Sequence, residues 1–203
     1  VLDARDCRFD RNGVIGVHVT DPESTATLRG TRISNTVPHS SGSWGMGIQL
    51  TEGASMEARD CHLVNNCAAG ITAGLGGAQL VLSDTRIERT KAQSSDGVGG
   101  YGLITLEQTL TSLIGCEIDH NIGPGIVAMD SNVTWIEDCL IENNGGVGVS
   151  LAGSPTHTVL TGCQILETEP LWTSLSGYDN LHLGFGIILG EGALLDMKDS
   201  SIN

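Results

Sequence analysis

The sequence is a tandem repeat of short phrases, and this repetition limits the possible folds more than any other feature. Residues 133–151, VTWIEDCLIENNGGVGVSL, show the pattern around Cys139. A small, weakly polar residue recurs every 23 to 37 positions, and we call this set the Cys/Thr column: Cys7, Thr31, Cys61, Thr85, Cys116, Cys139, Cys163 and Ser200. The chain therefore contains eight repeats, of which the first and the last are incomplete.

Apolar residues flank every member of this column at fixed distances. Three positions before it stand Ala4, Leu28, Ala58, Leu82, Leu113, Ile136, Leu160 and Met197, and two positions after it stand Phe9, Ile33, Leu63, Ile87, Ile118, Ile141, Ile165 and Ile202. Apolar and polar residues alternate over only three to five positions, which is strand periodicity, and turn residues end each run before a helix could form. A repeat of this length lies near the short end of the solenoid range and accommodates three short strands per coil.

The pattern resembles the right-handed parallel β-helix of the pectate-lyase-like superfamily over nearly the whole chain. The resemblance implies an all-β, single-stranded solenoid of about eight rungs, on the order of 38 Å long at ~4.8 Å per rung. It makes the strand that ends near Ile136 the second of its coil, puts residues 139–141 in the third strand, and makes residues 148–151 the first strand of the next coil. Stacked aliphatic side chains would form the core, because the chain has only three Trp, two Tyr and two Phe.

The residue before each member of the Cys/Thr column is always Asp or Gly. The set is Asp6, Gly30, Asp60, Asp84, Gly115, Asp138, Gly162 and Asp199. Both residue types tolerate a positive φ, so this Asp/Gly column predicts a left-handed turn residue in every coil. We interpret its five aspartates as turn formers and not as catalysts.

Two further columns are interpreted as interior ladders. Five positions after the Cys/Thr column lies an Asn/Thr column, which we expect to form hydrogen bonds from rung to rung: Asn12, Thr36, Asn66, Thr90, Asn121, Asn144 and Thr168. The stacked cysteines should be buried free thiols, because in-register Cβ vectors do not converge enough for a disulfide. Cys67 lies outside the column and is interpreted as a turn residue. No spacing matches a zinc site, so no metal site is predicted.

Charge and hydropathy exclude some classes of partner. The net charge of −14 argues against nucleic acid and against an anionic membrane surface. No run of 18 apolar residues is present, so no membrane span is expected. The repeat begins at Val1 and stops at Asn203 in mid-pattern, so residues 1–203 read as one β-helix domain cut from a longer solenoid. Without caps, we expect either flanking sequence at the ends or end-to-end self-association.

Three repeats contain long insertions, between Thr36 and Gly47, Thr90 and Gly102, and Thr168 and Gly186. All three leave from the same corner of the coil, which in the resemblance borders the first-strand face where pectin-active members bind substrate. The geometry suggests two shallow troughs, one between the first and second insertions and one between the second and third. Five of the seven aromatic residues lie in these insertions: Trp44, Tyr101, Trp172, Tyr178 and Phe185.

These aromatic side chains have two interpretations. They could bind sugar rings or a partner protein, or they could pack the loops onto the rod. The predicted ligand-binding residues are Trp44, Tyr101, Trp172, Tyr178, Gln49 and Thr72. Trp135 lies in the repeat itself and is interpreted as a packing residue.

The trough floor should be formed by the outward residues of the first strands. They are His18, Gln49, Thr72, Ile104, Val127, Ser150 and Ile188, with no carboxylate, Lys or Arg. The chain departs here from the lyase pattern of a calcium-binding acidic cluster with a basic residue, and from the several aspartates of the polygalacturonase pattern. The remaining acid/base candidates are His18, His39, His182, Asp21 and Glu52.

Acidic residues follow the first strands at Asp21, Glu23, Glu52, Glu107, Asp130 and Glu191. This line could hold Ca²⁺, but a solvated acidic edge is favoured because no known calcium-loop spacing occurs.

Two functions are consistent with these observations. The first is a non-catalytic, rigid β-helix module of a secreted or cell-surface protein, which binds a polysaccharide or a protein through the aromatic insertions. The second is a carbohydrate-active enzyme, a polysaccharide lyase, epimerase or glycoside hydrolase, acting in the first-strand trough. Calcium dependence would distinguish them, because an acidic rod binds an anionic glycan poorly without a cation.

Overall fold

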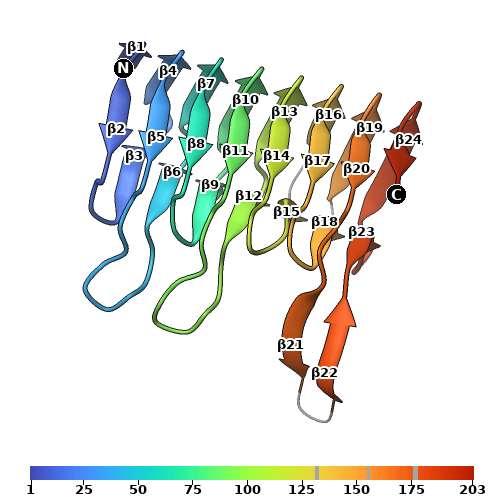
Figure 1. Ribbon diagram of the computed structural model, residues 1–203. Helices are drawn as coiled ribbons and strands as arrows, with labels where there is room; N and C mark the ends of the chain where they lie inside the picture. Colours follow the sequence, from blue (N-terminus) through green and yellow to red (C-terminus); the bar gives the residue numbers. More distant parts are fainter. Residues whose placement is uncertain (131–132, 155, 176–177) are drawn as a thin grey trace.

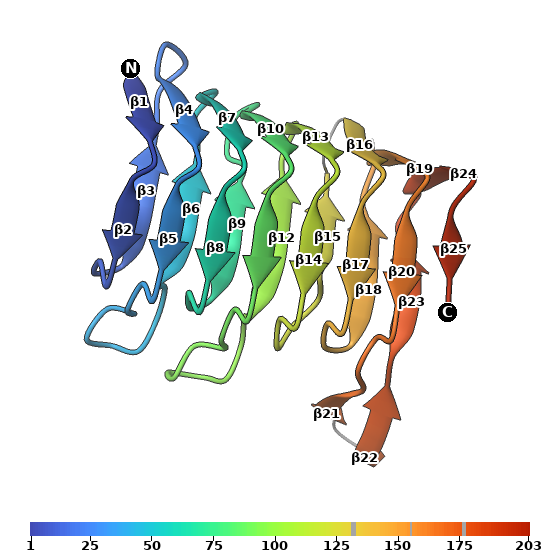
Figure 2. The same ribbon diagram turned by 45° about the horizontal axis from the view of Figure 1, so that its top comes forward.

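The chain folds into a single-stranded parallel β-helix, as predicted (Figures 1 and 2). The computed structural model describes residues 1–130, 133–154, 156–175 and 178–203, and for residues 133, 171–175 and 178–183 the backbone alone. Each strand of a coil pairs in parallel with the equivalent strand of the next coil, which produces three long sheets that run the length of the rod. No helix occurs in the described part of the chain.

Each coil contributes one strand to each sheet. The first-strand sheet contains β3 (Ile15–Val19), β6 (Met46–Leu50), β9 (Ala69–Ala73), β12 (Tyr101–Leu106), β15 (Ile126–Met129), β18 (Val147–Ala152) and β23 (Phe185–Leu189). The second-strand sheet contains β1 (Leu2–Arg5), β4 (Thr25–Arg29), β7 (Ser55–Arg59), β10 (Gln79–Ser83), β13 (Leu110–Ile114), β16 (Val133–Glu137), β19 (His157–Thr161) and β24 (Leu194–Lys198). The third-strand sheet contains β2 (Arg8–Asp10), β5 (Arg32–Ser34), β8 (His62–Val64), β11 (Arg86–Glu88), β14 (Glu117–Asp119), β17 (Leu140–Glu142), β20 (Gln164–Leu166) and β25 (Ser201–Ile202).

The strand register reproduces the columns of the repeat. Leu28 pairs with Ala58, and Ile87 pairs with Leu63 and Ile118, so equivalent residues stack directly above one another. These side chains point inward and are fully buried, and they form one continuous aliphatic core. Burial of such side chains is the main favourable term in the stability of the rod.

The Asp/Gly column has the predicted backbone conformation. All eight residues have positive φ, from 48° at Asp84 to 64° at Gly162. The prediction that the five aspartates form turns at this corner is therefore confirmed in geometry.

The two interior ladders are also present. Asn121 donates from Nδ2 to Asn144 Oδ1 at 2.9 Å, and the Thr36 hydroxyl donates to Asn66 Oδ1 at the same distance. All six cysteines are free thiols, and only Cys7 is exposed. Burial raises the pKa of the Cys61 thiol, which keeps it protonated.

The interpretation of Trp135 as a packing residue is wrong. It lies on the outer face of β16 with 48% of its surface exposed, while its neighbour Ile136 points into the core. The interpretation used only its position in the repeat, whereas strand periodicity places adjacent residues on opposite sides, so the inward Ile136 puts Trp135 on the outside.

Three connections between the third strand and the next first strand are long. Residues 35–45 join β5 to β6, and residues 89–100 join β11 to β12; we call them the first loop and the second loop. The third connection, between β20 and β23, contains an antiparallel hairpin of β21 (Leu171–Leu175) and β22 (Tyr178–Leu183). All three project from the same side of the rod (Figures 1 and 2).

Candidate functional site

A cavity of about 430 Å³ opens on the outer face of the first-strand sheet, over β6, β9 and β12. It lies above the short third rung, between the first and second loops. Its lining includes Trp44, Met46, Gln49, Thr51, Ala68, Ala69, Thr72, Gly74, Leu75, Gln93, Gly99, Tyr101, Ile104 and Leu106. The volume and the mainly apolar lining are typical of ligand-binding pockets.

The floor of the cavity contains part of the row that was predicted from the sequence. Gln49 pairs with Thr72, and Thr72 pairs with Ile104, so these three outward side chains stand on successive rungs. The row continues to His18 at one end and to Val127, Ser150 and Ile188 at the other. Because no residue of the lining carries a charged side chain, the site offers apolar contacts and neutral hydrogen-bonding groups.

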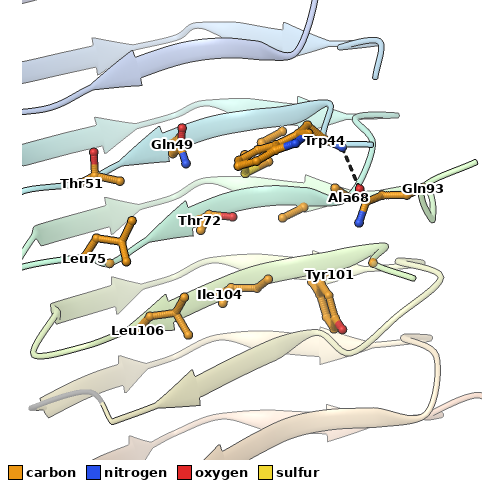
Figure 3. Close-up of a pocket in the computed structure, with 14 residues that line it drawn as sticks. Trp44, Gln49, Thr51, Ala68, Thr72, Leu75, Gln93, Tyr101, Ile104 and Leu106 are labelled. Atoms are coloured by element: carbon orange, nitrogen blue, oxygen red, sulfur yellow. Dashed lines mark hydrogen bonds between the residues drawn. The ribbon is translucent and has the colours of Figure 1, made fainter. Parts of the chain in front are cut away.

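Two aromatic side chains stand at the loop end of the cavity (Figure 3). Trp44 comes from the first loop and Tyr101 from the start of β12, and Ala68 lies between them on the third rung. Trp44 is 50% exposed, so its indole remains accessible to a ligand. Thr51, Leu75 and Leu106 border the opposite end, where the first strands finish (Figure 3).

The structure brings four of the six predicted binding residues into this one cavity: Trp44, Gln49, Thr72 and Tyr101. The side chains of Trp172 and Tyr178 lie outside the described residues. The second expected trough depends on the side chains of that same insertion, which lie outside the described residues.

The acid/base candidates do not line the cavity. His18 Nε2 lies 3.5 Å from the hydroxyl of Thr51, which does line it, and Glu52 accepts a hydrogen bond from the Thr20 hydroxyl at 3.2 Å. His39 contacts Ser41 within the first loop. Asp21 is exposed at the corner after β3, and the side chain of His182 lies outside the described residues.

The acidic line after the first strands has a conformational role that the sequence did not reveal. Asp21, Glu52, Glu107, Asp130 and Glu191 all have positive φ, between 40° and 78°. They therefore form a left-handed corner like the Asp/Gly column. This supports the interpretation of the line as a solvated edge.

An ion-pair network on the outer face of the third-strand sheet was not predicted. Arg86 binds both carboxylate oxygens of Asp119, at 3.0 and 2.8 Å, and His120 Nδ1 lies 2.6 Å from Asp119 Oδ2. Burial alone would raise the pKa of Asp119, but the hydrogen bonds from Arg86 and His120 lower it below the ordinary value. His62 links Arg32 to Glu88 in the same network.

The His62 contacts determine its tautomer. Arginine can only donate, so the 2.8 Å contact with Arg32 makes Nδ1 an acceptor, and Nε2 then donates to Glu88 Oε1. The network binds neighbouring rungs to one another. The sequence could have indicated this network. Arg86 and Glu88 occupy the same positions of their repeat as Glu117 and Asp119 do in the next one, which places charged residues on adjacent rungs.

Within the described residues, no group of three or more His, Cys, Asp and Glu side chains could hold a metal ion. The described part of the chain also has no helix that is long and apolar enough to cross a membrane.

The architecture defines a repeat protein of the parallel β-helix class. The family model described as "Right handed beta helix region" matches residues 3–87 and 81–193, and the chain belongs to that family. A comparison with curated protein sequences gives no match.

Proposed function

We propose that the chain is a non-catalytic binding module that takes a neutral polysaccharide in the cavity over the third rung. The observation that carries this proposal is the pairing of two aromatic side chains, the half-exposed Trp44 and the partly buried Tyr101, with an uncharged lining. A sugar ring has an apolar face that packs on an aromatic ring and hydroxyl groups that require hydrogen bonds. The glutamine and threonine side chains of the lining supply these bonds.

The charges around the cavity favour a neutral glycan over an acidic one. Its lining contains no Lys or Arg to pair with a uronate or a sulfate. Glu52 and Glu107 directly follow the lining residues Thr51 and Leu106. Their carboxylates would repel an anionic chain at short range. Binding should therefore not require Ca²⁺, which would be needed as a bridge between two anions.

The same lining also favours binding over catalysis. Glycoside hydrolysis and lyase chemistry need paired ionisable groups beside the reacting bond. Tyr101 is the only ionisable side chain among the residues that line the cavity. A rigid rod that presents such a site suits a spacer and adhesion module of a secreted or cell-surface protein.

The test is a calorimetric titration with cellohexaose, xylohexaose, mannohexaose and hexagalacturonate, each with and without Ca²⁺. We expect at least one neutral hexasaccharide to bind without Ca²⁺, and Trp44→Ala to weaken its binding at least tenfold, which corresponds to about 1.4 kcal/mol. Trp135→Ala is the matched control, because Trp135 is equally exposed, at 48%, but lies on another face of the rod.

Three results would contradict the proposal. Equal losses of hexasaccharide affinity in Trp44→Ala and Trp135→Ala would show that the binding site is not in the cavity. If hexagalacturonate is the one glycan that binds, and binds only with Ca²⁺, the ligand is an acidic polysaccharide and not a neutral one. Release of shorter products from a bound hexasaccharide would show catalysis.

A further inference from the structure

The first and second loops contact each other across the corner of the third rung. The Ser95 amide donates to the Gly42 carbonyl at 3.3 Å, and the Ser43 hydroxyl donates to Ser95 Oγ at 3.3 Å. The Trp44 amide donates to Gln93 Oε1 at 2.7 Å, which is the shortest of these contacts (Figure 3). The two loops thus form one wall at the end of the cavity, although they begin two rungs apart.

Trp44 occupies an uncommon backbone conformation. Its φ is 72°, in the left-handed region that large side chains rarely adopt. Such a conformation costs free energy and persists only where its surroundings hold it, and it is commonly found at binding sites.

One side of Trp44 is held rigidly by the rod. Gly45 donates to the Val14 carbonyl at 2.9 Å and accepts from the Cys67 amide at 2.8 Å. Gly45 has a φ of 104°, and a Cβ there would lie 2.5 Å from Cys67 Cβ. The backbone after Trp44 is therefore confined, whereas the orientation of the Trp44 peptide is set by the acceptor that its own amide finds.

We propose that Gln93 is the positioning residue for Trp44, so that the second loop determines where the aromatic platform of the first loop stands. This inference rests on the proposed function, because it concerns the same cavity. The Gln93 side-chain oxygen accepts the hydrogen bond from the Trp44 amide and so stabilises the left-handed backbone conformation of Trp44. Gln93 itself lines the cavity, so one side chain both orients the platform and borders the ligand. Selection of the glycan then depends on the second loop as much as on Trp44.

The test combines a measurement that needs no ligand with one that does. Hydrogen exchange of the Trp44 backbone amide is measured by NMR in Gln93→Leu, which removes the acceptor at similar size, and in Gln93→Glu, which keeps it. Gln93→Asn is a second variant, with the same amide one methylene too short to reach. Gln79→Leu is the control, since Gln79 is exposed on the second-strand sheet.

We expect Trp44 amide exchange to accelerate about three- to tenfold in Gln93→Leu and Gln93→Asn, as loss of a net hydrogen bond implies. Affinity for the neutral hexasaccharide that the wild type binds should fall by a similar factor, with no change in the unfolding midpoint larger than that of Gln79→Leu. Gln93→Glu should restore both properties. This rescue distinguishes positioning from a general effect on folding.

Unchanged Trp44 exchange in a folded Gln93→Leu or Gln93→Asn protein would overturn the inference. Accelerated exchange with unchanged hexasaccharide affinity would also overturn it, because Trp44 would then be positioned without consequence for binding. If no hexasaccharide binds the wild type but exchange accelerates as expected, the loop contact stands and the proposed function fails.

Discussion

At the scale of single residues, the corners of the coil depend on side chains that accept a left-handed backbone. Each of the three corners contains such residues. The Asp/Gly column was recognised from the sequence because it contains only two residue types. The corner after the third strand was not, since its left-handed residues are mixed: Arg11, Asn35, Asn65, Arg89, His120, Asn143 and Glu167. Only a residue type with a strong conformational preference leaves a pattern that one sequence can show.

The glycine that opens each first strand is required for space. At Gly47 a Cβ would lie 2.5 Å from the Gly70 carbonyl oxygen and 2.8 Å from Asn66 Nδ2. We expect Gly47→Ala to destabilise the protein by about 1–3 kcal/mol through overpacking. Gly13→Ala is the control, because nothing lies within 4 Å of a Cβ there, and its effect should stay within about 0.5 kcal/mol. Urea denaturation measures both, and equal effects would contradict this explanation.

At the scale of the strand, adjacent residues of β16 differ sharply in environment. Ile136 is 1% exposed in the core, whereas Trp135 is 48% exposed on the outer face. We expect Ile136→Ala to cost about 2–5 kcal/mol, and Trp135→Ala to cost no more than about 1 kcal/mol. Denaturant unfolding of the two variants gives the comparison. A larger cost for Trp135→Ala would show that the tryptophan is covered in solution.

The Asn/Thr ladder is the other device that joins successive strands. Asn121 accepts from the Thr90 amide at 3.0 Å and donates to the Ile87 carbonyl at 3.2 Å and to Asn144. Asn121→Leu would leave these buried partners unpaired, and we expect a loss of about 2–5 kcal/mol.

Asn12 belongs to the same ladder at the first rung, where its Nδ2 has no partner within the described residues. Asn12→Ala should therefore cost less than about 1 kcal/mol. Comparable thermal shifts for Asn12→Ala and Asn121→Leu would show that the ladder does not carry stability between rungs.

The strands, their register and the floor of the cavity could be predicted because each follows from a column that repeats. Gln49 and Thr72 were placed correctly by the same offset that places Ile33 and Leu63 in the core. The contact between Trp44 and Gln93 could not be predicted, since it joins two loops that occur once each and obey no repeat. The same reason explains why the antiparallel pairing of β21 and β22 inside the third insertion was missed.

At the scale of the whole molecule, the two halves of the rod differ in charge. Nine of the ten Lys and Arg residues lie within residues 1–91, beside ten Asp and Glu, whereas residues 92–203 contain one basic and fourteen acidic residues. The overall charge of −14 conceals this asymmetry. Most of the ion pairs between rungs in the described residues accordingly take their basic partner from residues 1–91, as between Arg59 and Asp84, and Arg86 and Asp119.

This asymmetry predicts that acid weakens the rungs that contain the basic residues and their carboxylate partners. Hydrogen bonds from Asn35 and Ser34 lower the pKa of Asp10 to about 2, and Asp119 is also lowered, mainly by Arg86. A carboxyl whose folded pKa lies below its unfolded value of about 4 contributes stability above pH 4. That contribution is lost as the pH falls toward 2, because the unfolded chain then binds more protons than the folded one.

We therefore expect the free energy of unfolding to fall between about pH 4 and pH 2, and to fall less steeply in Asp10→Asn, which has one lowered carboxyl fewer. Asp119→Asn should in addition cost about 1.5–3 kcal/mol at pH 7, since Arg86 would lose the charged hydrogen bonds to its buried partner but keep Glu88 and Glu117. Glu57→Gln, at an exposed site on the second-strand sheet, is the control. It should change neither the free energy of unfolding at pH 7 nor its decrease between about pH 4 and pH 2 appreciably. Urea titrations at a series of pH values measure all of these. If the free energy of unfolding falls as steeply with acid in Asp10→Asn as in the wild type, the contacts of Asp10 with Ser34 and Asn35 do not persist in solution. The side-chain link that these contacts make between the first two rungs would then be absent as well.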